Sequence, residues 1–489
     1  MKAKLLIPIV VVLVIFAAAV FTNIRSKQDK VESEAVVLNV MIMSSASKET
    51  VARISDALSD VTMEKCGFRV HLTNSSVTEY TAALHRLAAL GKEPDVFIAY
   101  QNPALRDLAK TGLALPLDEL LNEYPLLKDS VPNEYWHIGI VDGQIYGIPT
   151  IISRNYAMGF IARKDILDSL SIEADNIQTW EGLHELLILV KETYPDVTPV
   201  VPHFGTLFPT FEEDPLGDGL GVLVNHEGTT VENLYESEVF YELCQKMQGW
   251  YQEGLLLENG YAYVTEPRNV LITAFNALGY FAKVNEFASA NGVIIEGTEM
   301  VNIQLSQPYI DSAMINVSWS VSSKTTKQKE ALQLIELLYT DREAVDICLY
   351  GQEGIDYQRV DETHITALNG KGSWNSTTWG WPNRIAGSIW LNPTTLEPDA
   401  YEIKGEPIIS PAFGFVFFAA DLQKQMDACQ KVVDKYANSL MYGYLDPDEA
   451  LPLFNQELKE AGIDQIIAEK QRQLDLFLEI KHSGNGERK

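Results

Sequence analysis

Positive charge is scarce in this sequence. Its 489 residues include 38 lysines and arginines against 67 aspartates and glutamates, which gives a formal net charge of -29 at pH 7. A surface of this sign repels the phosphate groups of nucleic acids, so no nucleic-acid partner is expected. The same charge keeps copies of the chain apart in solution, and we therefore expect a monomer.

Cysteine is scarce as well. The four cysteines lie far apart and form no Cys-x-x-Cys motif, which argues against a zinc site or a redox centre. An even number of cysteines would permit two disulfides. Cys244, Cys348 and Cys429 fall within apolar helical patterns, however, so we favour buried free thiols.

Motifs of catalysis are missing or incomplete. The pair His184-Glu185 begins like a zinc-protease helix, but the second histidine is absent, and no Gly-x-Ser-x-Gly elbow occurs. Gly217–Gly221 lacks the spacing of a dinucleotide loop and indicates a flexible turn. The acidic residues between 212 and 218 could hold calcium, but they lack EF-hand spacing, so a solvated acidic loop is favoured. We therefore expect a protein that is not an enzyme, with no catalytic residue, metal ligand or cofactor.

One uncharged stretch near the N-terminus indicates the cellular compartment in which the protein works. The apolar run Leu5–Phe21 follows Lys2 and Lys4 and precedes a polar linker. These features are typical of an export signal, and the run is near the lower length limit for a membrane-spanning helix. Residues 1–35 are thus predicted to be a cleaved signal or a retained membrane anchor with its linker, and the mature chain to be extracellular and cell-surface associated. The first cysteine is Cys66, which excludes lipid attachment at an N-terminal cysteine.

Short apolar runs alternate with helical patterns in the first part of the chain. The patterns predict strands at 36–43, 68–72 and 95–99, and helices from about 48, at 78–90 and at 102–111. This order indicates βαβ units and a parallel sheet, so the fold class is α/β. The chain is longer than the roughly 250–300 residues at which single cores stop growing, so two lobes are expected.

Polar side chains follow two of these predicted strands. Ser45 comes just after the first strand, and Gln101 and Asn102 come just after the third. Ligands of open α/β sheets bind beyond the carboxyl ends of the strands, so these residues are candidate ligand contacts. A helix cap is the alternative role for Ser45 and Asn102.

Five motifs, in order along the chain, resemble those of a known family. They are Glu93–Phe97 with Gly112–Asp118, Asp142–Pro149 (DGQIYGIP), Ser322–Lys327 with Ala331–Leu334, Tyr350–Tyr357 (YGQEGIDY), and the region from Ser410 to Asp464. Over roughly residues 36 to 478 the chain resembles extracellular solute-binding proteins of family 1, the binding components of ABC-type carbohydrate importers, in their lipoprotein-type branch. That family usually carries a lipid-bearing N-terminal cysteine, which this sequence lacks.

The resemblance implies a periplasmic-binding-protein-like fold of type II, in which two hinge-linked lobes close on a ligand in the cleft between them. The implied divisions are 36–155 with 310–365 for the first lobe, 156–309 with 366–489 including the C-terminal helices for the second, and crossings near 142–162 and 309–321. The implied function is the capture of a small ligand, an oligosaccharide, for the permease subunits of an ABC importer.

Four of the eight tryptophans lie between residues 370 and 399, in a segment rich in glycine, proline and asparagine. Aromatic faces match the C–H faces of sugar rings, and loops often carry function. Trp379, Trp381 and Asn383 are therefore candidate ligand contacts, expected on the second lobe, opposite the residues that follow the third strand. The alternative is that both tryptophans only seal that lobe. Trp319, in an apolar strand pattern, is a further candidate for which core and cleft positions stay open.

Two other functions could use the same lobes. A surface enzyme acting on glycans would need a pair of inward carboxylates at glycosidase spacing, which the sequence does not locate. A sensory ectodomain would bind its ligand without permease partners. The ordered motifs favour the binding protein over both alternatives.

Overall fold

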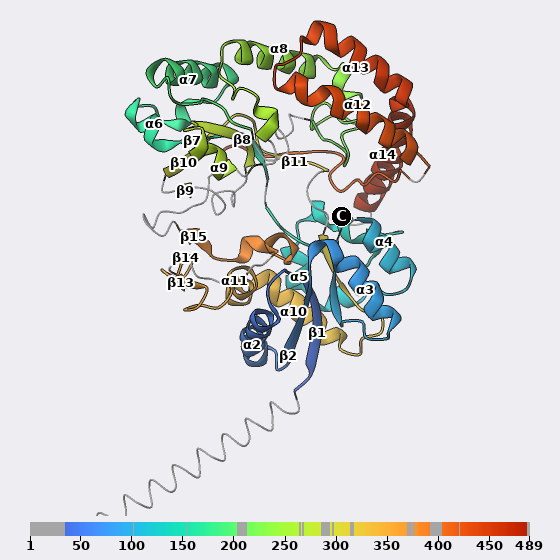
Figure 1. Ribbon diagram of the computed structural model, residues 1–489. Coiled ribbons are helices and arrows are strands. Elements are labelled where there is room, and N and C mark those ends of the chain that lie inside the picture. Colours follow the sequence, from blue (N-terminus) through green and yellow to red (C-terminus); the bar gives the residue numbers. More distant parts are fainter. Residues whose placement is uncertain are drawn as a thin grey trace, which may run out of the picture.

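The structure, a computed structural model, describes residues 35–100, 102–153, 155–202, 213–263, 266, 268–284, 294–295, 298–312, 317–368, 374, 377–391, 403–419 and 421–486. They form two α/β lobes joined by segments that run between them (Figure 1). Residues 1–34, which include the expected export segment, lie outside the described residues. Within the described part of the chain, no helix combines the length and the hydropathy needed to cross a bilayer.

The first lobe is built on a five-stranded sheet with the strand order β2-β1-β3-β12-β6. Its strands are β1 (Val37–Met43), β2 (Arg69–Ser75), β3 (Val96–Tyr100), β6 (Ile148–Pro149) and β12 (Val317–Val321). Strands β1, β2 and β3 are parallel, as the sequence predicts, and β12 arrives from a distant part of the chain, antiparallel to β3 and β6. The three parallel strands therefore end at one common edge, called here the carboxyl edge, and begin at the opposite amino edge.

Helices pack on this sheet and close the first apolar core. They are α2 (Lys48–Lys65), α3 (Tyr80–Ala89), α4 (Asn102–Lys110), α5 (Pro125–Ser130), α10 (Gln328–Thr340) and α11 (Arg342–Tyr350).

A hairpin of β4 (Ile140–Val141) and β5 (Gln144–Ile145) precedes β6. Asp142 and Gly143 form its turn with φ angles of 48° and 84°, which is the left-handed region that an Asp-Gly pair tolerates.

The second lobe has a sheet with the order β8-β7-β10-β9. Its strands are β7 (Ala157–Arg163), β8 (Gly279–Val284), β9 (Ile294–Ile295) and β10 (Thr298–Gln304), and its helices are α6 (Lys164–Ser169), α7 (Trp180–Thr193), α8 (Glu238–Gln252), α9 (Arg268–Ala274), α12 (Gln423–Met441), α13 (Pro447–Ala461) and α14 (Ile463–Gly486). Pro447 opens α13, and Gly462 ends it with a φ angle of 103°.

The division between the lobes differs from the boundary expected at residue 366. Strands β13 (Tyr357–Arg359), β14 (His364–Ala367) and β15 (Ile389–Leu391) form one small sheet, so the chain on both sides of residue 366 belongs to one unit. Trp381 contributes to the apolar core of the first lobe. The described residues between 366 and 391 therefore belong to the first lobe, because strand pairing and packing bring them back beside α11.

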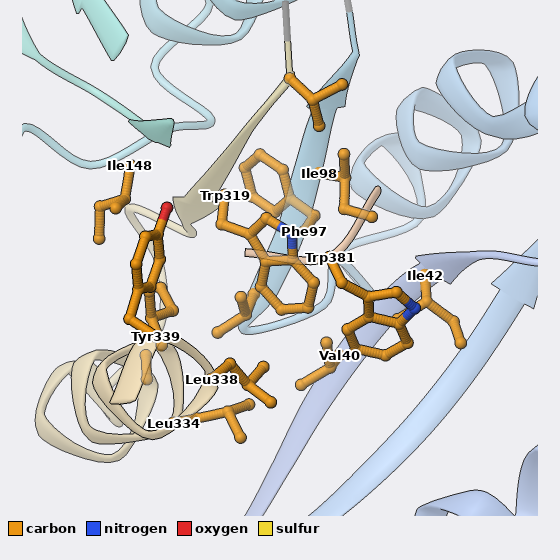
Figure 2. Packing of buried hydrophobic residues seen from close by; sticks show 14 of the residues in the cluster. Val40, Ile42, Phe97, Ile98, Ile148, Trp319, Leu334, Leu338, Tyr339 and Trp381 are labelled. Carbon is orange, nitrogen blue, oxygen red and sulfur yellow. The ribbon is translucent and has the colours of Figure 1, made fainter. Parts of the chain in front are cut away.

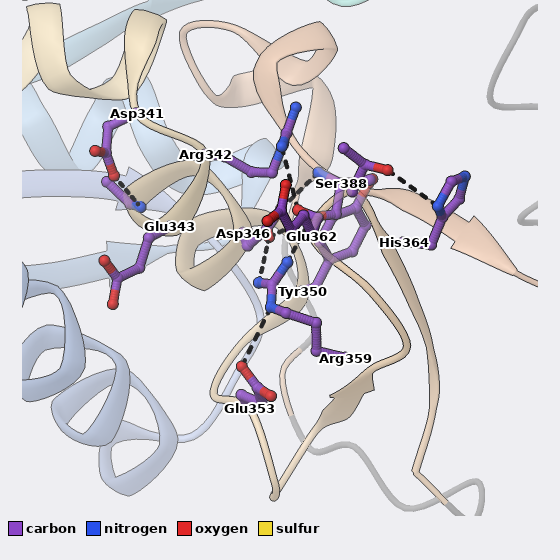
Figure 3. A network of polar contacts seen from close by, with 12 residues as sticks. Asp341, Arg342, Glu343, Asp346, Tyr350, Glu353, Arg359, Glu362, His364 and Ser388 are labelled. Atoms are coloured by element: carbon purple, nitrogen blue, oxygen red, sulfur yellow. Dashed lines mark hydrogen bonds and ion pairs between the residues drawn. The ribbon is translucent and has the colours of Figure 1, made fainter.

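A buried polar network attaches this small sheet to α11. The carboxylate of Asp346, which is fully buried, accepts hydrogen bonds from Arg359 at 2.8 Å and from the N–H and hydroxyl of Ser388, both at 2.6 Å. The hydroxyl of Tyr350 donates to the Ser388 carbonyl at 2.9 Å. Figure 3 shows these groups meeting beside α11. The network therefore holds β13 and the residue just before β15 against α11 on the first lobe.

The cysteine thiols are all free. Cys244, Cys348 and Cys429 are buried, in agreement with the prediction from their apolar helical patterns. Burial raises the pKa of Cys244 to about 12 and that of Cys429 to about 11, so both thiols are protonated near neutral pH.

Candidate ligand-binding site

A short segment, residues 377–383, covers the carboxyl edge of the first-lobe sheet. Its 3₁₀ turn η8 (Thr378–Gly380) lies over the ends of β1 and β3. A side-chain carbon added to Gly380 would lie 3.2 Å from Met43 Cε and 3.7 Å from Ile98 Cδ1. The expectation that this segment belongs to the second lobe, opposite Asn102, is therefore wrong. It lies on the first lobe, at the edge where open α/β sheets bind ligands.

Two tryptophans anchor this segment in the core. Trp319 on β12 is 0% exposed and Trp381 is 3% exposed, and their ring centroids are 5.5 Å apart. The indole N–H of Trp319 donates a 2.7 Å hydrogen bond to the carbonyl of Gly380. Figure 2 shows both rings among apolar side chains of β1, β3 and α10. This burial favours the core alternative for Trp319 and does not support Trp381 as a ligand contact, because neither ring has a face open to a ligand in this structure.

Trp379 differs from both of these tryptophans. It is half-buried, and its ring packs against Tyr100 with centroids 5.1 Å apart and planes inclined by 36°. Tyr100 is the last residue of β3, and it was not among the residues expected from the sequence, although its position at a strand end was a usable signal. The two rings form an aromatic surface at the carboxyl edge that also carries a phenol hydroxyl and an indole N–H.

Ser45 lies at the same edge, in the loop that follows β1. It is exposed, and the residue that caps α2 is Ser47, so the helix-cap alternative does not apply to Ser45. The side-chain amide of Asn74 holds the loop by donating to the carbonyls of Ser44 and Ala46, each at 3.0 Å. Ser45 thus stands on an ordered loop at the same edge as the aromatic surface.

The remaining three candidates differ in what the structure says of them. Gln101 lies outside the described residues. Asn102 is the first residue of α4 and directly follows this edge of the sheet. Asn383 is engaged by the protein itself, because its amide donates to the Tyr339 carbonyl at 2.9 Å and accepts from the Ile385 N–H at 3.1 Å. Its observed role is to hold residues 383–385 against the end of α10.

Three segments connect the lobes side by side. Tyr156 forms an antiparallel bridge with Tyr309, and β11 (Tyr309–Ile310) pairs in parallel with β16 (Ile408–Ile409). Figure 1 shows β11 on the side of the second lobe that faces the first lobe. The first two connections fall in the crossing regions expected near 142–162 and 309–321, whereas the third lies well beyond the expected boundary. Short crossing strands of this kind can act as a hinge.

A buried carboxylate ties two of these crossing segments together. Asp214 is 0% exposed, and it accepts hydrogen bonds from the Ser312 N–H at 3.0 Å and from the Ser410 hydroxyl at 2.5 Å. The Ser312 hydroxyl donates to the same carboxylate. The interpretation of a solvated acidic loop is therefore wrong for Asp214, since distant serines satisfy its oxygens in the interior.

A second carboxylate of the hinge is paired with a cation. Asp311 is 1% exposed, and the ammonium of Lys283 on β8 donates to it at 3.1 Å, while His226 Nε2 lies 3.8 Å away. Burial acts to raise the pKa of Asp311, but the nearby His226 and the charge and hydrogen bond of Lys283 outweigh it and lower the pKa below its usual value. A charged pair therefore links the second-lobe sheet to a crossing segment.

A separate groove of about 870 Å³ lies on the second lobe. It is lined by residues of α8 and α13, among them Tyr241, Asp448 and Lys459. Both helices lie on the side of this lobe that faces away from the first lobe (Figure 1). In the part of the chain that the structure describes, no group of three or more His, Cys, Asp or Glu side chains could hold a metal ion.

Two α/β lobes of this topology, joined by paired crossing segments, define the architecture of type II solute-binding proteins. The model of the family described as bacterial extracellular solute-binding protein matches residues 57–348, more than half of the chain, so the chain belongs to this family. A protein of this family is an extracellular binding protein and not an enzyme. A second model, described as Domain of unknown function (DUF3502), matches residues 411–479.

Individual relatives extend over nearly the whole chain. A carbohydrate ABC transporter substrate-binding protein of Streptococcus pneumoniae serotype 4 is 24% identical over 439 residues, which cover 86% of each protein. The N-glycan transport solute binding protein (NgtS) from Streptococcus pneumoniae is 20% identical with a TM-score of 0.73, covering 91% of this chain and 100% of that one. An HMO-binding, ABC-transporter-associated protein from Bifidobacterium longum infantis is 15% identical with a TM-score of 0.58, covering 91% and 99%. These likenesses confirm the two-lobed α/β fold.

Proposed function

We propose that this protein captures an oligosaccharide outside the cell and delivers it to an ABC-type importer, and that the glycan binds at the carboxyl edge of the first lobe. The observation that carries the proposal is the half-buried ring of Trp379, tilted against the ring of Tyr100 at that edge. The names of two relatives, one a carbohydrate ABC transporter substrate-binding protein and one an N-glycan transport protein, support the ligand class and the importer.

The side chains at this edge suit a sugar. Trp379 and Tyr100 offer apolar faces to the C–H side of a ring, and their N–H and hydroxyl groups can bond to ring hydroxyls. Ser45 adds a donor and acceptor on the neighbouring loop. Gln101 and Asn102 remain candidates from the sequence, since they directly follow Tyr100.

Closure of the second lobe over this edge would complete the site. The crossing segments that bend would be those at Tyr156, β11 and β16. Small-angle scattering should show a smaller radius of gyration with a bound glycan, and an unchanged radius would count against closure.

The apolar run Leu5–Phe21 would direct export of the chain: a retained run would tether the protein at the outer face of the membrane beside the permease subunits, and a cleaved run would release it. Protease added to intact cells with a permeable wall should then digest the chain. Full protection until lysis would contradict an external location.

The binding proposal is tested with a panel of glycans: Man1GlcNAc, Man5GlcNAc and human-milk oligosaccharides. A glycan that binds only the folded state raises the melting temperature of the parent chain. Trp379→Ala should then raise the dissociation constant at least tenfold, about 1.4 kcal/mol, with little loss of stability. Trp390 is a matched control, since it is also half-buried on the first lobe but packs on Tyr350. A panel without any binding glycan overturns the ligand class, and equal affinities for the parent and Trp379→Ala overturn the site.

A further inference from the structure

The second lobe has its own strand-end edge, and this edge faces the crossing segments. Val200 forms parallel bridges with Leu256 on one side and with Gly279, the first residue of β8, on the other. At the far end of β8, Val284 pairs with Ala157, the first residue of β7 after the chain has crossed from the first lobe. The carboxyl ends of these parallel segments therefore point toward the hinge, which is where a ligand held between the lobes would meet the second lobe.

An exposed tyrosine follows one of these segments. The 3₁₀ turn η6 (Gly260–Tyr263) comes three residues after Leu257, and Tyr261 in this turn is 48% exposed. Tyr261 and Phe418 are the aromatic side chains of the described residues that have more than a third of their surface exposed. Most other aromatic rings of the described chain pack in the cores, so the exposure of Tyr261 distinguishes it.

A packed cluster of tyrosines supports Tyr261 from behind. Its ring meets Tyr442 edge-on with centroids 6.0 Å apart, Tyr442 lies 5.7 Å from Tyr444, and Tyr444 lies 5.0 Å from Tyr251 of α8. The hydroxyl of Tyr444 also accepts the backbone N–H of Tyr261 at 3.4 Å. A side-chain carbon on Gly260 would lie 3.0 Å from Tyr442 Cε1, so glycine permits this close approach. A ring held in this way loses little conformational freedom when it binds a ligand.

We infer that Tyr261 is a ligand-contacting residue of the second lobe, which stacks on the glycan from the side opposite Trp379. This inference rests on the proposed function of the first-lobe edge. Because Tyr261 belongs to the second lobe, its contact with the glycan forms when the lobes close, and it stabilises the closed complex. Loss of this contact therefore accelerates dissociation more than it slows association.

The test compares five proteins, the parent chain, Tyr261→Ala, Tyr261→Phe, Tyr241→Ala and Trp379→Ala, each titrated with Man1GlcNAc, Man5GlcNAc and human-milk oligosaccharides. Tyr241 is the matched control, a partly exposed tyrosine of the same lobe that lines the groove between α8 and α13. Tyr261→Ala should raise the dissociation constant about tenfold, mainly through a faster dissociation rate, whereas Tyr261→Phe keeps the ring and should stay within about threefold of the parent. Tyr241→Ala should bind like the parent.

Two outcomes overturn the inference, and they are distinguishable. If Trp379→Ala weakens binding and Tyr261→Ala does not, Tyr261 is only an exposed tyrosine and the proposed function stands. If the parent binds no glycan of the set, the proposed function fails, and the role of Tyr261 fails with it.

Discussion

The two edges of the first-lobe sheet differ in how far the protein itself covers their polar side chains. At the amino edge, the buried Asp95 accepts hydrogen bonds from the Asn39 N–H at 2.7 Å, the Thr325 hydroxyl at 2.6 Å and the Lys327 ammonium at 2.9 Å. These bonds join the starts of β1 and β3 to the loop before α10. The amino edge is thus closed by contacts within the protein.

The carboxyl edge, by contrast, carries side chains that stay accessible to solvent. Ser45 is exposed, and Trp379 is half-buried on Tyr100. Two motifs of the family resemblance, Glu93–Phe97 and Ser322–Lys327, lie at the closed amino edge. These motifs therefore identify the scaffold, while the edge proposed to bind the ligand is recognised by its place in the sheet.

Removing the support beneath the carboxyl edge should have the largest effect. Trp381→Ala would leave a cavity beside Trp319, and a buried tryptophan replaced by alanine costs roughly 3–5 kcal/mol of unfolding free energy. Urea denaturation measures this loss. A loss below about 1 kcal/mol would show that the ring is not part of the core.

Opening the amino edge should cost less and leave binding intact. Asp95→Ala removes a carboxylate with three partners, and hydrogen bonds to charged groups contribute about 1.5–3 kcal/mol, so unfolding should become easier by about 2–3 kcal/mol. Glycan affinity of the folded protein should not change. Asp56→Ala is the control, because Asp56 is largely exposed and only weakly paired with Arg69. A large loss of affinity in Asp95→Ala would break the distinction between the two edges.

Acid should weaken the amino edge in a defined pH range. Burial tends to raise the pKa of Asp95, but hydrogen bonds from Thr325 and Lys327 outweigh it and lower the pKa. The stabilisation is therefore fully present above the unfolded value, about pH 3.9, and is lost as the pH falls through the lower folded value. Unfolding curves of the parent and Asp95→Asn should converge as the pH falls below about 4. Parallel pH profiles for the two proteins would contradict this assignment.

Paired serine variants should give the smallest effect and the sharpest contrast. Ser45→Ala should weaken glycan binding by a factor of about 2–10, the value of one hydrogen bond. Ser47→Ala removes the cap of α2 and should cost about 1 kcal/mol of stability without changing affinity. Melting and calorimetric titration distinguish the two variants. The reverse pattern would place the functional serine at position 47.

Local patterns in the sequence were sufficient to predict the three parallel strands of the first lobe and the place where each of them ends. Runs such as Val37–Met43 are short, apolar and partly β-branched, and the residue after a strand in an α/β sheet stands near a ligand crevice. The lobe that holds Trp379 could not be predicted in this way. It depends on the pairing of β14 with β15 and on the hydrogen bond from Trp319 to Gly380, contacts between distant residues that leave no local pattern.

The buried hydrogen bonds of the hinge escaped prediction for a similar reason. The carboxylate of Asp214 resembles any acidic loop residue in the sequence, because its partners Ser312 and Ser410 are 98 and 196 residues away. Tyr100 and Tyr261 also carry no motif. Their candidacy comes from the strands that they follow and from the rings that they contact.

The most direct test of the proposed site is a crystal structure of the chain with a glycan that raises its melting temperature. We predict a sugar ring against the face of Trp379 at the carboxyl edge of the first lobe, with Tyr261 of the second lobe on its other side. A glycan bound instead in the groove between α8 and α13, or between the lobes without contact to Trp379, would contradict this prediction.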